Sequence, residues 1–272
     1  MRSKIYTYEL RARRVAVNIA LCVYAATILF SVNAWAGSEE VVDYVASERL
    51  SGVLSGQLIA SKAFLCEQSN CEVGTVLRPS DRSMYQKFDM LRIRPGGQYK
   101  FTVGDTVDIV ERLRNVSFRR TKYPLLRVNG QVVVRSIDRD NAIVNAELIH
   151  YWKPISGREL VMPSQSYQKI EIPRLISAAQ KLEGVVVTHV EDGVVPYLKD
   201  LFIVDIGKNS GIRIGDVFTV FGSDSGDFGE EFLVGTVINS SSSFSTLVIN
   251  KIHQSSLSQG DRVVLTMRIG EE

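Results

Sequence analysis

The strongest constraint on the fold is an internal repeat, because two segments of this 272-residue sequence align at an offset of 111 residues. The run 89–105 aligns without a gap with the run 200–216, and most of their apolar positions coincide. Both runs end in a Gly-Asp pair. We expect these pairs to form tight turns, in which glycine supplies a positive φ and aspartate binds the local backbone. The four turn residues are Gly104, Asp105, Gly215 and Asp216.

Short runs rich in Val, Ile, Phe and Thr follow each Gly-Asp pair, separated by Gly, Asp and Asn. This pattern is typical of short strands joined by turns. About 80 residues with five or six such strands predict a small barrel or a compact sandwich, which leaves few exposed sheet edges. We therefore expect a mainly β protein built from two tandem homologous units of SH3-like size, after an N-terminal helical segment. The expected strands are 106–110, 130–134, 142–149 and 157–161, and then 217–220, 235–238, 245–252 and 260–265.

The chain divides into five expected segments. With 45% hydrophobic and 23% charged residues, its composition excludes a mainly disordered protein. Helical spacing of apolar residues over 38–65 predicts the N-terminal helix, and a short helix is expected at 175–182 in the connection between the units. The turn at 191–193 is expected to join two strands as a hairpin. The segments are a signal peptide (1–36), a helical segment with a cysteine pair (37–84), a first β unit (85–164), a linker (165–183) and a second β unit (184–268).

The N-terminus has the pattern of an export signal. Basic residues precede the apolar run 15–30, and Ala34-Trp35-Ala36 follows it. A basic region, an apolar core and a small-x-small exit predict a secretory signal peptide that is cut after Ala36. An uncleaved membrane anchor is the alternative, although a bilayer span needs about 20 apolar residues. We expect a periplasmic protein of a Gram-negative bacterium, which could associate with the outer membrane.

Two cysteines, Cys66 and Cys71, remain after removal of the leader. An even number of cysteines in an exported protein predicts a disulfide, although two free thiols remain the alternative. The rest of the sequence shows no pattern of a catalytic or metal site. The three histidines are far apart, and none has a partner at metal-ligand spacing. We expect no catalytic residues, no metal and no cofactor. Residues 37–272 have 27 Lys and Arg against 29 Asp and Glu, so we expect no nucleic-acid partner.

The stretch 111–127 is the most distinctive local feature, because its six basic residues face only one acid, Glu111. It is a polar insertion of the first unit that the second unit lacks. It reads either as a solvated loop or as a docking surface for an acidic protein or a glycan-phosphate polymer. The candidate docking residues are Arg112, Arg114, Arg119, Arg120, Lys122 and Arg127.

Residues 99–109 resemble the opening of a LysM peptidoglycan-binding module, which would continue into two helices. A wider resemblance covers about 180 residues: the runs 183–193, 202–207 and 210–216, with Gly235-Thr-Val and Gly260-Asp-Arg-Val. Together they resemble the C-terminal domain of the flagellar assembly protein T family, which also occurs in secretin-associated proteins of type IV pili. Those proteins carry a preceding β unit like residues 85–163.

The resemblance implies a non-catalytic periplasmic protein that docks on an outer-membrane machine. Its expected partner is a secretin ring or a flagellar basal-body ring protein, and the expected form is a multimer in a ring. The pilus proteins usually carry a LysM module, whereas we expect residues 37–80 to hold a helix and the cysteine pair instead. We also expect no room for both of the flagellar family's further N-terminal domains. The alternative function is a peptidoglycan-binding module that anchors an envelope complex to the cell wall.

Overall fold

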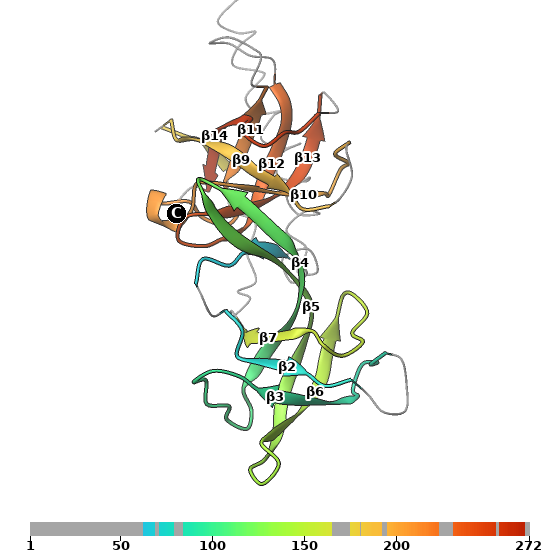
Figure 1. Cartoon of the computed structure of the whole chain (residues 1–272). Coiled ribbons are helices and arrows are strands. Elements are labelled where there is room, and N and C mark those ends of the chain that lie inside the picture. Colours follow the sequence, from blue (N-terminus) through green and yellow to red (C-terminus); the bar gives the residue numbers. More distant parts are fainter. Residues whose placement is uncertain are drawn as a thin grey trace, which may run out of the picture. The chain divides into compact units, whose positions relative to one another are not determined.

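The computed structural model describes residues 62–68, 71–78, 84–164, 175–179, 181–191, 195–222, 231–253 and 256–269. These residues belong to one compact unit, Arg49–Glu272. They form a mainly β structure with a closed six-strand barrel and another sheet (Figure 1). Its one helical element in the described ranges is a 3₁₀ turn, η1 (Lys208–Ser210). No helix within those ranges is long and apolar enough to cross a membrane.

The C-terminal part of the chain forms the barrel. In it, β11 pairs with both β12 and β14, so the order β11-β12-β13-β10-β9-β14 closes on itself. A short seventh strand, β8 (Leu175–Ser177), pairs with the end of β14. We call the six-strand ring the second barrel. Its strands are β9 (Glu183–His189), β10 (Leu201–Val204), β11 (Val217–Phe221), β12 (Glu231–Ser240), β13 (Ser245–Ile252) and β14 (Arg262–Ile269).

The first sheet precedes it, in the order β1-β5-β4-β7-β2-β3-β6. In this sheet β5 also pairs with β6, so the series of pairings β5-β4-β7-β2-β3-β6 ends at the strand where it began. Strands β4 and β5 are by far its longest and run on past β7 (Figure 1). The strands are β1 (Ala63–Leu65), β2 (Gly74–Val76), β3 (Met90–Pro95), β4 (Thr106–Phe118), β5 (Thr121–Asp138), β6 (Ile143–Tyr151) and β7 (Leu160–Pro163).

The two sheets share one pairing scheme. Every pair formed among β2 to β7 has a counterpart among β9 to β14, in chain order: β2–β3 with β9–β10, β2–β7 with β9–β14, β3–β6 with β10–β13, β4–β5 with β11–β12, β4–β7 with β11–β14 and β5–β6 with β12–β13. The first residues of β4 and β11, Thr106 and Val217, are 111 positions apart, which is the repeat offset of the sequence.

One turn recurs at the start of strands in both sheets. Gly104 and Gly215 have φ of 94° and 97°. The aspartate after each glycine accepts a hydrogen bond from the backbone N–H of the residue three positions before that aspartate. In the first turn, Asp105 accepts from Thr102 at 2.7 Å. Such local side-chain bonds favour turns over continued strand. The same arrangement recurs where no sequence motif marks it. The six positive-φ residues are Phe88, Gly104, Arg158, Lys199, Gly215 and Gly260, and the acids after them are Asp89, Asp105, Glu159, Asp200, Asp216 and Asp261.

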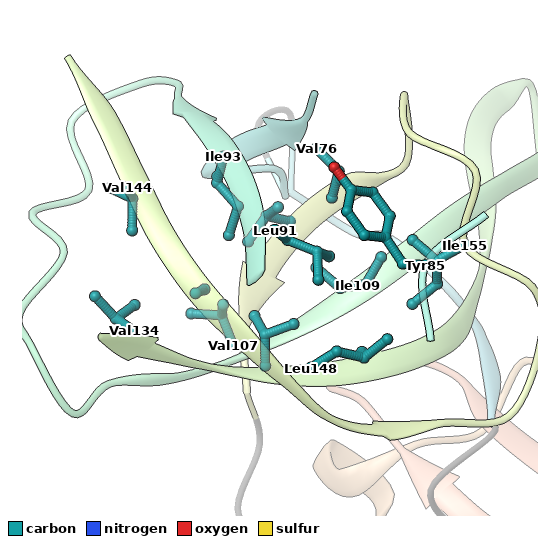
Figure 2. Packing of buried hydrophobic residues seen from close by; sticks show 13 residues of the cluster. Val76, Tyr85, Leu91, Ile93, Val107, Ile109, Val134, Val144, Leu148 and Ile155 are labelled. Carbon is teal, nitrogen blue, oxygen red and sulfur yellow. The ribbon is translucent and has the colours of Figure 1, made fainter. Parts of the chain in front are cut away.

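Alternation of buried and exposed residues builds the interiors, because successive side chains of a strand point to opposite faces. In β3, Leu91 and Ile93 are buried while Met90 and Arg92 are exposed. Figure 2 shows Leu91 and Ile93 of β3 pointing into the interior that Ile109 of β4 and Leu148 of β6 also line. The second barrel is filled in the same way by its own apolar cluster, whose largest members are Phe202 and Phe218.

Several local expectations differ from the structure. Residues 111–127 are strand and hairpin, not a solvated loop. The expected helix at 175–182 is instead β8 at its start, where Leu175 pairs with Ile269. The helices that a LysM module needs are absent, since β4 and β5 occupy residues 106–138. An 11-residue connection, 190–200, replaces the expected tight hairpin between β9 and β10. The last residues of the expected N-terminal helix form β1, and the rest of that helix and the leader lie outside the described residues.

Candidate functional site

The hairpin over residues 111–127 is the clearest candidate site, and we call it the arm. Its strands pair up to Phe118 and Thr121, so Arg119 and Arg120 alone form the turn. Both turn residues have positive φ, 46° and 66°. Two successive left-handed residues match the twist of the flanking strands in a two-residue hairpin. The local geometry therefore continues β4 and β5 as a paired ribbon.

One face of the arm packs on the second barrel. Paired residues share a face, so Phe118, Val116 and Tyr123 point the same way. The ring of Tyr123 lies edge-on to Phe244, with centroids 5.0 Å apart, and Phe118 contacts the same ring at 6.2 Å. Phe244 is only 5% exposed, so the three rings form a small apolar interface between the arm and the second barrel.

Three of the arm's arginines bind the second barrel. The Arg119 guanidinium lies 2.6 Å from Asp205, and Arg127 lies 3.1 Å from Glu191. Arg114 donates to the carbonyl oxygens of His189 and Val190, and to Thr188 Oγ1 at 3.3 Å. Guanidinium groups suit such sites because they present several donors in a fixed plane. These three candidate residues therefore join parts of this chain.

The other three candidates point elsewhere. Arg112 bonds to Asn115 Oδ1 at 2.8 Å, which is on the arm itself. Arg120 and Lys122 are exposed, and neither forms an ion pair with a described residue. The six residues that the sequence groups together are thus divided, and Arg120 with Lys122 forms the outward basic edge of the arm.

The strand β1 adds a second connection beside the arm. It pairs with β5 on one side, and its Ala63 carbonyl accepts a 2.6 Å hydrogen bond from Thr246 of β13. Just after β1, the carboxylate of Glu67 accepts hydrogen bonds from the Ser241 hydroxyl and from the Ser243 amide at 3.0 Å. Bonds to a carboxylate are stronger than bonds between neutral groups. Glu67 is not recognisable as a contact residue from the sequence, because nothing local marks its serine partners.

The cysteine pair lies at this connection. The sulfur atoms of Cys66 and Cys71 are within disulfide distance, and Glu67 lies in the loop between them. Cys66 is buried in a small apolar cluster with Val110, Leu126 and Val128. A closed loop of this size limits the positions that the Glu67 side chain can reach, which favours its bonds to the second barrel.

A buried polar cluster lies where the arm meets the first sheet. Gln131 and Ser164 both donate to the carboxylate of Asp108, at 3.1 and 2.8 Å. Lys62, at the start of β1, is 5% exposed. Burial lowers the pKa of Lys62 to about 8, the charge of Asp108 opposes that shift, and the charge of Lys208 adds to it.

No group in the described ranges has the geometry of a metal site of three or more His, Cys, Asp or Glu ligands. The histidines lie apart: His189 is 3.4 Å from Asp200, and His253 is 3.7 Å from Glu231. Each pair combines a histidine with one acid. The contacts of the arm with the second barrel are ionic and aromatic.

Comparison with known protein families and with curated proteins finds no match to this sequence.

Proposed function

We propose that this chain is an exported, non-catalytic assembly protein of the Gram-negative periplasm that docks on an outer-membrane machine. The machine would be a secretin ring, as in type IV pili, or a flagellar basal-body ring. The proposal combines the export signal, the cysteine pair and the resemblance of residues 85–268 to periplasmic assembly proteins. We also infer that the two sheets are tandem copies of one ancestral barrel, which the shared pairing scheme and the repeat offset support.

The observation that carries the proposal is the difference between the inner face and the outer edge of the arm. Its inner face is committed to aromatic and ionic contacts within the chain, at Phe244 and Asp205. Its outer edge presents Arg120 and Lys122 without an acidic partner among the described residues. A paired ribbon that is held at its base and along one face presents charges in a fixed position, and fixed charges favour one complementary partner surface over others.

The partner surface would be acidic. Exposed charges of this kind mainly set the rate and specificity of association and are screened by salt, over about 8 Å at physiological ionic strength. We therefore expect docking that weakens as salt rises. Arg112 would contribute less, because Asn115 already engages it.

The test is crosslinking of the tagged, exported protein in living cells, followed by mass spectrometry of what is recovered. Secretin or flagellar ring subunits are expected with the wild type, and Arg120→Glu with Lys122→Glu should remove most of that recovery. Arg139→Glu, at a basic site on the β5–β6 turn of the first sheet, is the matched control and should leave it unchanged.

Two results would contradict the proposal. Equal recovery of ring subunits with the arm variant would show that this edge does not dock. Recovery of muropeptides alone, together with sedimentation on purified sacculi, would favour the peptidoglycan-anchoring alternative.

A further inference from the structure

Exposed apolar side chains gather at one place in each repeat unit. Six of the ten large apolar residues that are exposed in the described ranges lie in the segments 84–90 and 195–201, which correspond at the repeat offset of 111. Each segment is the turn that leads into β3 or β10, with the first residue of that strand. We call them the β3 turn and the β10 turn. The six residues are Met84, Phe88, Met90, Val195, Tyr197 and Leu198.

Both turns are fixed to their sheets by backbone hydrogen bonds. The Phe88 amide donates to the Leu148 carbonyl at 2.7 Å, and the Lys199 amide forms the equivalent bond to Ile249 at 2.9 Å. The aspartate after each of these residues accepts a further amide of its own turn. The turns therefore hold their exposed side chains in fixed positions.

The residue types at the strained position of these turns are not explained by the fold. Phe88 and Lys199 have φ of 71° and 73°, in the left-handed region, where a side chain adds strain that glycine avoids. Gly104, Gly215 and Gly260 occupy the same place in other turns of this kind. Because Phe88 is 66% exposed, packing within the chain offsets little of the strain. Strained residues cluster at functional sites, and a contact outside the chain would explain a phenylalanine here.

The charge that these turns present is positive. The Nζ of Lys87 lies 5.0 Å from the centre of the Phe88 ring, and the β10 turn has Lys199. Neither lysine forms an ion pair with a described residue. Two acids, Asp89 and Asp200, lie in or next to the turns, and each accepts a backbone amide there.

The two turns share a composition but not a shape. Phe88 stands where the β10 turn has Lys199, and Lys87 stands where it has Leu198. What is common to both is large apolar side chains beside a lysine. A protein pocket selects the shape of a side chain, whereas a membrane interface accepts any apolar group that enters the acyl boundary and any lysine that reaches an anionic headgroup.

We propose that the β3 turn and the β10 turn bind a phospholipid surface, with their apolar side chains inserted and Lys87 and Lys199 at anionic headgroups. Two contacts on one chain bind more tightly than either alone. This contact is separate from the basic edge of the arm. It is tested on lipid alone, so it can fail while the proposed docking on an envelope machine stands, and the reverse also holds.

The test is co-sedimentation of the full exported protein with vesicles of phosphatidylethanolamine and phosphatidylglycerol. The wild type should bind, and binding should weaken with salt and on vesicles of phosphatidylcholine alone. Phe88→Gly should lower the partition coefficient about fivefold, and Tyr197→Ser with Leu198→Ser should lower it about tenfold. Phe88→Gly should also raise the midpoint of urea unfolding, because glycine relieves the strain. Weaker binding by a more stable protein separates a lost contact from a lost fold.

Val103→Ser is the matched control, because Val103 is 61% exposed and lies in the turn before β4. Three antiparallel pairings, through β6 and β5, lead from β3 to β4, so the two strands start at opposite ends of the first sheet. This variant should bind like the wild type. A wild type that ignores the anionic vesicles, unchanged binding of either turn variant, or equal binding to phosphatidylcholine would each overturn the proposal. Crosslinks from these turns to a protein, without vesicle binding, would assign them to a protein partner instead.

Discussion

Asp205 joins Arg119 of the arm to the backbone of the second barrel: one carboxylate oxygen lies 2.6 Å from the guanidinium, and the other accepts the Val185 amide at 2.7 Å. The Asp205 side chain is 7% exposed, whereas that of Arg119 is 74% exposed. The two partners therefore contribute unequally. Asp205 stabilises the barrel backbone at Val185 and also binds the arm.

Replacing the two partners should give unequal losses of stability. Arg119→Ala removes an exposed ion pair and should lower the free energy of unfolding by less than about 1 kcal/mol. Asp205→Ala also leaves the Val185 amide without its acceptor and should cost about 1–3 kcal/mol. Urea unfolding measures both. Equal losses would mean that the backbone bond does not stabilise the barrel.

Phe244→Ala should weaken the coupling between the first sheet and the second barrel. It removes the ring that Phe118 and Tyr123 contact, and a buried Phe→Ala change costs about 3–5 kcal/mol. We expect calorimetry to resolve two unfolding transitions where the wild type has one. Phe88→Ala is the control, because Phe88 is 66% exposed, and it should keep a single transition. A single transition in both variants would contradict the interface described for the arm.

Gly104→Ala tests the recurring turn. Its φ is 94° and no atom lies within 4 Å of the added Cβ, so the cost comes from the backbone alone and should be about 1–2 kcal/mol. The control is Gly96→Ala, which has an ordinary φ and a nearest contact of 3.6 Å to the added Cβ. That change should be neutral or slightly stabilising. A loss at Gly96 as large as that at Gly104 would contradict this explanation.

Glu67→Gln tests the connection beside β1. The amide side chain accepts weaker hydrogen bonds from Ser241 and Ser243, so the protein should lose about 1–2 kcal/mol of stability. Glu72→Gln is the matched control on an exposed glutamate. Reduction of the Cys66–Cys71 pair should shrink the effect of Glu67→Gln, because the free loop holds the carboxylate less firmly. Equal effects of Glu67→Gln in oxidised and reduced protein would show that the disulfide does not support this contact.

Lys62 gives a pH dependence of known sign. Its pKa is about 8 in the folded protein, against an ordinary value of 10.5, so between these pH values the unfolded chain binds more protons. Stability from this group therefore rises with pH over that window, by up to about 3 kcal/mol. The unfolding free energy of the wild type should therefore increase relative to that of Lys62→Met from pH 8 to pH 10. A difference that does not change with pH would refute the lowered pKa.

The turns at Gly104 and Gly215 are predictable, because a Gly-Asp pair encodes both the positive φ and the side-chain bond locally. The equivalent turns at Phe88 and Lys199 lack the glycine, so only the backbone reveals them. The partners of the arm are harder to predict. Arg119 and Asp205 are 86 residues apart, and their contact depends on how the two sheets pack, which no local pattern encodes. For the same reason, the sequence of residues 111–127 predicts a solvated loop or a docking surface, although Arg114, Val116 and Phe118 share one strand face.

The contacts of the arm also determine whether the two parts of this protein stay together after a peptide bond between them is cut. Its contacts join the first sheet to the second barrel at Phe244, Asp205 and Glu191, in addition to the covalent connection from β7 to β8. A cut between Ser164 and Leu175 would therefore produce two fragments that stay bound. The same logic makes the chain a candidate for a split reporter, whose halves reassociate wherever they are brought together.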